Sequence, residues 1–174
     1  MIDIKKYGAI DIGSNAVRLL ISSVTTMDGK NPRFKKTSLV RVSYEQLLSG
    51  YGLEQIYQAI CAINGKEEVK LSAAEISQQA VAETCDLCHQ SLAQFCKVLG
   101  SFAGNLALTL NCQGGVYIAG GIAPRFIDFI KNSDFRTRFE TKGRLSHIPK
   151  QSPTYIITED QPGLLGAAAL LLQR

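Results

Sequence analysis

Apolar residues near the N-terminus form short runs rich in Val, Ile and Leu, which is the composition of β-strands. Turns rich in Asp, Asn and Gly separate these runs. Strands joined by short turns predict an antiparallel meander. We expect its strands at Tyr7–Gly13, Ala16–Val24 and Phe34–Val42.

The spacing of apolar residues then becomes helical. Ser43 and Gln46 have the spacing of a capping box and predict the start of a short helix. This helix contains Leu47 and Leu48 and is expected to end at Ser49–Gly52. Apolar residues that recur every three or four positions predict further helices at Leu53–Asn64, after Ser72 and over Thr84–Leu110.

The expected helix over Thr84–Leu110 carries two stripes. The first is apolar and follows Cys88, Leu92, Phe95, Leu99, Phe102 and Leu106. The second holds the small residues Gly100, Ala103, Gly104 and Ala107. Each interior glycine costs a helix about 1 kcal/mol relative to alanine. We therefore expect tight packing along this stripe, against the sheet, with a ligand near the backbone as the alternative.

The last third of the chain alternates strand and helix patterns. An apolar run bounded by glycines predicts a buried strand at Val116–Ala119. Gly120 and Gly121 follow it, and Pro124 is well placed for the first turn of a helix. The remaining expected elements are a polar, basic surface loop at Asp134–His147 with a short helix at Phe135–Phe139, a strand at Thr154–Thr158 and a closing helix at Pro162–Leu172.

The Gly120-Gly121 turn joins a strand end to a helix start. Residues without side chains let a ligand approach the backbone, and a helix N-terminus offers free N–H groups with a partial positive charge. This chemistry suits a flat or anionic ligand such as a nucleotide. A tight turn without any ligand explains the same glycine pair.

The first turn of the meander has residues suited to a phosphate and a metal ion. The N–H groups of Gly13, Ser14 and Asn15 can point into one concavity. Asp11 at a strand end can hold a hydrated Mg²⁺, and Arg18 could face a phosphate. An ordinary hairpin turn, in which Asp and Asn bond their own backbone, is the alternative.

Composition narrows the class of protein. The 174 residues are 45% hydrophobic and 20% charged, which suits a globular domain with a core. No apolar run reaches the length of a membrane span and no signal-peptide pattern is present, so we expect no membrane partner, a cytoplasmic location and reduced thiols for the five cysteines. The net charge of +4 is mild, and the cations are scattered except in Lys131–Lys150, so we expect no nucleic-acid partner.

The segment Cys85–His89, CDLCH, has the form of a c-type haem attachment motif. We exclude haem because its attachment needs export, for which the sequence carries no signal. Zinc would need two further ligands at matching spacing, and His147 is distant in the sequence. We interpret these residues as buried helical cysteines, with Cys88 on the apolar stripe.

The segment Tyr7–Val42 resembles the N-terminal end of the exopolyphosphatase/guanosine-pentaphosphatase family. The pattern Asp-x-Gly-Ser-Asn-x-x-Arg-Leu, which starts at Asp11, is that family's first phosphate-binding hairpin. The resemblance covers the first quarter of the chain. Counterparts of the family's catalytic carboxylate and second phosphate loop are not found.

The segment Arg41–Gln173 resembles the C-terminal part of the bacterial glucokinase (hexokinase) family. The matching runs are VSYEQLLSGYGL, ETCDLCHQSLAQFC, GNLAL, GGVYIAGGIAPRF and PGLLGAAAL. In that family, the residues that match Ser49-Gly50 and Gly120-Gly121-Ile122 border the adenosine and phosphates of ATP. The family's catalytic Asp and its glucose-binding Asn, Glu and His residues come earlier in its sequence and have no counterpart here.

Both resemblances imply the actin-like ATPase superfamily, whose domains are ribonuclease-H-like. We therefore expect one α/β domain over residues 1–174, with a five-stranded mixed sheet in the order three strands, helix, strand, helix, strand, helix. Residues 1–42 would form the meander, 43–81 a helical insert and 82–174 the adenosine-side half. Because the two resemblances meet near Arg41–Ser43, the chain looks like a chimera of two families.

These expectations combine into a domain that binds ATP or ADP weakly with Mg²⁺, lacks a glucose site and has little or no sugar-kinase activity. Asp11 is the one candidate for a catalytic group. The alternatives are an ATP-dependent glucokinase completed by another chain, a phosphatase acting on polyphosphate or guanosine pentaphosphate, and a structural domain without a ligand. An open sheet edge and the glycine-rich helix face would allow a homodimer.

Overall fold

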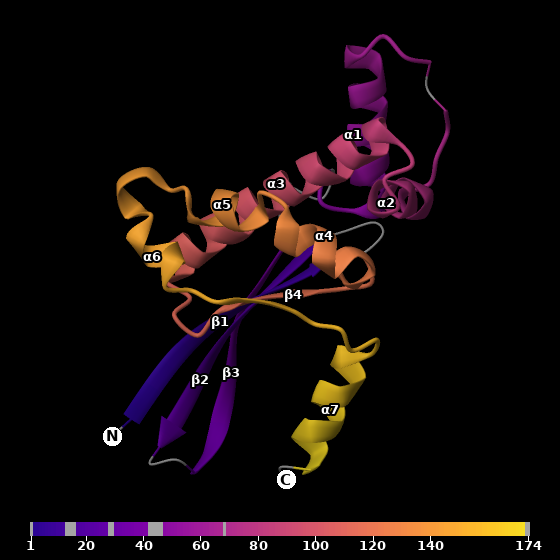
Figure 1. Cartoon of the computed structure of the whole chain (residues 1–174). Helices are drawn as coiled ribbons and strands as arrows, with labels where there is room; N and C mark the ends of the chain where they lie inside the picture. Colours follow the sequence, from indigo (N-terminus) through magenta and orange to yellow (C-terminus); the bar gives the residue numbers. More distant parts are fainter. Residues whose placement is uncertain (1, 13–16, 28–29, 42–46, 68, 173–174) are drawn as a thin grey trace.

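The computed structural model of the chain describes residues 2–12, 17–27, 30–41, 47–67 and 69–172 (Figure 1). Its strands are β1 (Ile2–Ile12), β2 (Val17–Met27), β3 (Lys30–Arg41), β4 (Val116–Ala119) and β5 (Thr154–Ile156). Its α-helices are α1 (Gly50–Ile63), α2 (Ala73–Val81), α3 (Asp86–Leu110), α4 (Ile127–Asn132), α5 (Phe135–Glu140), α6 (His147–Lys150) and α7 (Pro162–Leu172). The 3₁₀ helices are η2 (Ala123–Phe126) and η3 (Gly143–Leu145).

The strands form a mixed sheet in the order β3-β2-β1-β4-β5. The pairs β1–β2 and β2–β3 are antiparallel, which confirms the predicted meander, although its strands are longer than predicted. The pairs β1–β4 and β4–β5 are parallel. The arrangement is therefore α/β, with the N-terminal meander and the later strands in one sheet.

Helix α3 is the centre of the hydrophobic core. It packs against α1, α2, α5 and β1, and Figure 1 shows α1–α6 gathered on one side of the sheet. The predicted apolar stripe lies in this core, because Cys88, Leu92, Phe95, Leu99 and Phe102 are all buried. The periodicity of the sequence thus identified the correct face of the helix.

The small-residue stripe of α3 packs against α5, and our expectation that it meets the sheet was wrong. A Cβ atom on Gly100 would overlap the carbonyl oxygen of Phe135, and one on Gly104 would overlap that of Phe139. The glycines therefore bring two helix backbones together, so packing explains them.

The short helix predicted at Phe135–Phe139 is confirmed as α5, but it contributes to the core rather than lying in a surface loop. Phe135 and Phe139 of α5 are buried. Arg136 lies over the Phe139 ring at 4.7 Å, and its Nε donates to Glu140 Oε1 at 2.6 Å. Its Nη1 donates to the Ser152 carbonyl at 2.9 Å. Arg136, paired with Glu140, thus packs on the Phe139 ring and ties α5 to the Ser152 carbonyl. A count of polar residues cannot reveal such packing.

Several helix starts differ from the predictions. Residues 47–49 are turn and bend rather than helix, and Ser49–Gly52 begins α1 instead of ending a helix. Ser43 lies outside the described residues. Helix α3 begins at Asp86 with Cys85 as its N-cap, two residues later than expected. The predicted helix after Ser72 is confirmed as α2, and Ser72 forms a full capping box with Glu75.

Helix α7 lies apart from the other helices, in yellow in Figure 1. Its sequence is almost entirely apolar, yet Leu164 and Leu165 are 68% and 64% exposed, and Leu171 is 70% exposed. Across the described residues, no helix is both long and apolar enough to cross a bilayer. Helix α7 is therefore a short apolar helix without a packing partner among the described residues.

Candidate functional site

The predicted phosphate turn and the predicted glycine turn follow neighbouring parallel strands. In the β1–β4 pair, Asp11 is the register partner of Ala119, the residue directly before Gly120. In the β1–β2 pair, Asp11 is opposite Arg18. Because parallel neighbours end at the same edge of the sheet, the backbone brings Asp11, Arg18 and the glycine turn to one corner. We call this the β1–β4 corner.

The glycine turn has the backbone that its sequence suggested. Gly120 has φ +103°, a backbone conformation that residues other than glycine rarely adopt. Gly121 has open space where a side chain would begin. Ile122 then precedes η2, and Pro124 stands in its first turn as predicted. The helical segment is short, since four residues of 3₁₀ helix precede the six residues of α4, so its dipole is smaller than that of a long helix.

The three remaining residues of the phosphate turn, Gly13, Ser14 and Asn15, lie outside the described residues. Ser49 and Gly50 are described and lie at the start of α1. Ser49 is only 2% exposed, and its Oγ accepts a hydrogen bond from the Gly52 N–H at 3.0 Å. Within the described part of the chain, no hydrogen bond joins Ser49 or Gly50 to the glycine turn.

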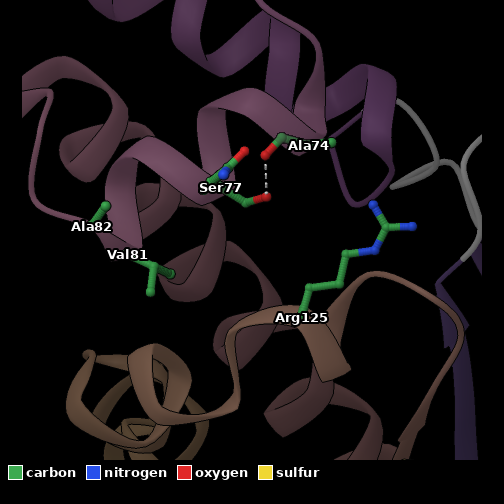
Figure 2. A pocket seen from close by; sticks show the side chains of 6 residues that line it. Ala74, Ser77, Val81, Ala82 and Arg125 are labelled. Atoms are coloured by element: carbon green, nitrogen blue, oxygen red, sulfur yellow. Dashed lines mark hydrogen bonds between the residues drawn. The ribbon is translucent and has the colours of Figure 1, made fainter.

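A pocket of about 360 Å³ lies between α2 and η2. Figure 2 shows Arg125 of η2 extending toward the part of α2 that carries Ala74 and Ser77. The other lining residues are Gln78, Val81 and Ala82. One cation beside small apolar side chains is a suitable environment for an aromatic ring that bears an anionic group.

Our sequence analysis missed this pocket, although a signal was available. Arg125 is the first cation after the Gly-Gly turn, three residues beyond Ile122. The opposite wall comes from α2, which we expected only as an insert. A periodic pattern predicts that α2 is a helix, but it does not show which element lies across from it.

A second pocket, of about 600 Å³, lies where α4 and α5 meet β4 and β5. Its lining is mainly apolar, with Ile118, Ile130 and Tyr155, and Lys131 and Arg136 also line it. Among the described residues, neither pocket is lined by Ser49, Gly50 or the glycine turn. Ser49, Gly50 and the glycine turn therefore lie outside both pockets.

Over the residues that the structure describes, no three acidic, cysteine or histidine side chains gather as a metal-ligand set. Mg²⁺ keeps several waters and needs only one or two carboxylates, so a lone Asp at a strand end is compatible with its chemistry. Asp11 therefore remains the residue to test for Mg²⁺.

A family model, curated sequences and solved structures all relate this chain to glucokinases. A family model described as glucokinase matches residues 16–174. The glucokinase of Colwellia psychrerythraea is 66% identical over 155 residues, which cover 86% of this chain and 47% of that relative. A crystal structure of a glucokinase from an Antarctic psychrotroph has a TM-score of 0.78 at 30% identity and covers 98% of this chain and 59% of that one. A pCBH ParM quadruple mutant, with a TM-score of 0.52 at 18% identity, shares the fold.

These matches do not support the expected chimera or the exopolyphosphatase segment. The family model begins at residue 16, well before the expected join near Arg41–Ser43. The Antarctic glucokinase structure covers nearly the whole chain, including most of the meander. A short phosphate-type motif on a common fold has low specificity, which is why it misled us.

The chain spans about half the length of the curated relatives it matches, 47% for the Colwellia glucokinase and 41% for that of Photorhabdus laumondii. Its α/β sheet, its resemblance to a solved glucokinase and the family model all agree. The chain belongs to the glucokinase family.

Proposed function

We propose that this chain is the nucleotide-binding half of a glucokinase-type sugar kinase, built as a single ribonuclease-H-like domain. It binds ATP or ADP with Mg²⁺ at the β1–β4 corner. Asp11 holds the Mg²⁺ through water, and the N–H groups of Gly13, Ser14 and Asn15 bind phosphate together with Arg18. The remaining nucleotide contacts come from Ser49-Gly50 and Gly120-Gly121-Ile122.

The observation that supports this proposal is the register of β1 and β4. The backbone of Asp11 is opposite that of Ala119, so an acidic residue and a glycine turn stand at the ends of two neighbouring parallel strands. Ligands of open α/β sheets bind outside the carboxyl ends of the strands. Gly121 leaves open space there, so a ligand can approach the backbone.

The pocket between α2 and η2 extends this site. It begins three residues after Ile122, at Arg125, and its volume of about 360 Å³ falls within the range of small-molecule sites. We assign the adenine ring to its apolar wall of Ala74, Val81 and Ala82, with the guanidinium group of Arg125 near the ribose and phosphates. Such a site selects a nucleotide over inorganic phosphate.

Sugar phosphorylation needs more than this half. Phosphoryl transfer requires metal, phosphate ligands and a base in a cleft that excludes water. If the site is open to water, the metal ion and the phosphates stay hydrated, and each electrostatic interaction between them and the protein is weaker. Because the relatives named glucokinase are about twice as long, we infer that glucose is phosphorylated only when another segment or chain completes the cleft.

Isothermal titration of the full chain with Mg-ADP tests the proposal. We expect weak, saturable binding. Asp11→Asn should reduce affinity about tenfold in Mg²⁺, on the order of 1.4 kcal/mol, and leave affinity in EDTA unchanged. Absence of heat up to millimolar Mg-ADP or Mg-ATP removes the proposal.

A pair of glycine variants separates occlusion of the site from damage to the fold. Gly121→Leu fills the open space at the turn, whereas Gly166→Leu makes the same change in α7, where space is also open. We expect the first to abolish binding and the second to leave it unchanged. Equal losses in both variants would contradict a site at the turn.

A coupled glucose 6-phosphate assay tests the requirement for completion. The chain alone should give no turnover. Addition of the part of the Colwellia glucokinase that this chain does not match should restore it. Turnover by the chain alone would show that a sugar site exists within these 174 residues.

A further inference from the structure

Cys85 and Cys88 lie together at the N-terminus of α3, away from the residues of the proposed nucleotide site. Cys85 is the N-cap and is partly exposed, and its Sγ accepts a hydrogen bond from the Cys88 N–H at 3.3 Å. Cys88 is buried, and its Sγ donates to Gln79 Oε1 at 3.8 Å. A partly exposed thiol and a buried thiol therefore lie within one turn of each other at the start of a long helix.

A third thiol lies close to this pair. Cys61 of α1 is buried and interacts with the Tyr57 hydroxyl, and burial raises the pKa of Tyr57 with a further contribution from the Cys61 hydrogen bond. None of the five cysteines forms a disulfide in this structure. Among the described residues, these thiols are not part of a metal-ligand set.

We propose that Cys85 and Cys88 form a thiol–disulfide pair that reacts with a low-molecular-weight disulfide such as oxidised glutathione. The Cys-x-x-Cys spacing at a helix N-terminus is the arrangement used by dithiol redox sites, because the N–H groups of the first turn stabilise a thiolate. This pair makes the chain responsive to the thiol redox state of its surroundings.

The reaction proceeds in two exchanges. Cys85 loses its proton to water, and its thiolate attacks one sulfur of the oxidant, which breaks the S–S bond and releases one small thiolate. Cys88 then loses its proton, and its thiolate attacks Cys85 Sγ and releases the second small thiolate. The two released thiolates take up two protons, so two electrons and two protons pass from the protein to the oxidant.

The exposure of the two sulfurs assigns their roles. Cys85 is partly exposed and meets the oxidant first. Burial raises the pKa of Cys88 to about 12, so Cys88 reacts only when a mixed disulfide on Cys85 presents a sulfur beside it. Cys85 is therefore the attacking thiol, and Cys88 is the resolving one.

Oxidation changes the junction between α2 and α3. A disulfide removes the Cys88 thiol hydrogen and with it the hydrogen bond to Gln79 Oε1. The backbone carbonyl of Gln79 also accepts the Thr84 N–H at 3.1 Å, so Gln79 joins α2 to the connection that leads to Cys85. We expect faster amide exchange at residues 79–85 in the oxidised chain.

The full chain, incubated in glutathione buffers of varied ratio and then alkylated, tests the pair by peptide mass spectrometry. The expected product has lost two hydrogen atoms, contains one Cys85–Cys88 linkage and returns to dithiol in reduced glutathione. A linkage to Cys61, a lasting glutathione adduct on Cys85 or an unoxidised chain each overturns the proposal. This wild-type measurement needs no variant to fold.

Two serine variants sharpen the result. Cys85→Ser retains a good N-cap, so it should fold and lose the disulfide completely. Cys96→Ser changes another buried cysteine of α3 and should leave disulfide formation unchanged. If a disulfide still forms in Cys85→Ser, the oxidation belongs to other cysteines and the proposal is wrong. Thermal unfolding of each variant checks its fold.

Discussion

Helices α3 and α7 are both rich in apolar residues and both contain glycines, but their surroundings are opposite. In α3 Leu92 and Leu99 are buried, and the glycines meet the backbone of α5. In α7 the described leucines are exposed, and a side chain at either glycine would enter open space. Two apolar, glycine-containing helices of one chain are therefore buried to different extents.

The amphipathic pattern reflects this difference. Helix α3 alternates an apolar stripe with Lys, Asn and Gln, so only one face can be buried. Helix α7, PGLLGAAALLL, has no polar face at all. A helix that is apolar all round is typical of complete burial. Helix α7 has the composition of a buried helix, although its described leucines are exposed in this structure.

The largest expected difference between the two helices comes from leucine truncation. Leu99→Ala in α3 removes a fully buried side chain and should lower the free energy of unfolding by about 2–5 kcal/mol. Leu165→Ala in α7 should change it by less than about 0.5 kcal/mol. Denaturant unfolding of the two variants measures both. Equal losses would mean that α7 is packed in solution.

The glycines give a smaller contrast. Gly104→Ala places a Cβ on the Phe139 carbonyl and should lower the free energy of unfolding by about 1–3 kcal/mol. Gly166→Ala has open space and should raise the helical stability of α7 by up to about 1 kcal/mol. Circular dichroism during thermal unfolding checks both signs. A neutral Gly104→Ala would refute close contact between α3 and α5.

The smallest expected effect on stability comes from Glu75 in the first turn of α2. Helix α7 has no charged residue in its first turn. Hydrogen bonds from the side chain and backbone of Ser72 hold the pKa of Glu75 below its usual 4.5. Because the folded pKa is the lower one, this stabilisation is present above about pH 4.5 and is lost as pH falls through the lowered value. Glu75→Gln should remove that pH-dependent part. Unfolding measured at neutral and acidic pH, with Glu67→Gln as control, checks the difference.

Local patterns predicted most elements of this fold. The meander, α2, α3 and α7 follow from apolar spacing and from caps such as Ser72, which depend on neighbours in sequence. The partners of these elements could not be predicted in the same way. Gly100 and Gly104 signalled close packing, but contact with α5 depends on residues some 35 positions away.

The candidate site was predictable to a similar extent. Asp11 and the Gly120 turn were placed on strand ends by pattern, and the sheet order then made them neighbours. The pocket at Arg125 escaped prediction because its walls come from α2 and η2, which are distant in sequence. The start of α1 was misplaced because the glycines around Ser49 suggested an end, whereas the Ser49 hydroxyl caps a beginning.

Strand β3 forms one edge of the sheet, and its composition affects how copies of this chain meet. An uncovered edge strand can pair with another chain and lead to aggregation. The twelve residues of β3 include Pro32, which has no N–H to offer, and five cations, Lys30, Arg33, Lys35, Lys36 and Arg41. Like charges on two such strands would repel each other, most strongly at low ionic strength, so this composition would disfavour edge-to-edge pairing through β3 and would weigh against a homodimer formed there.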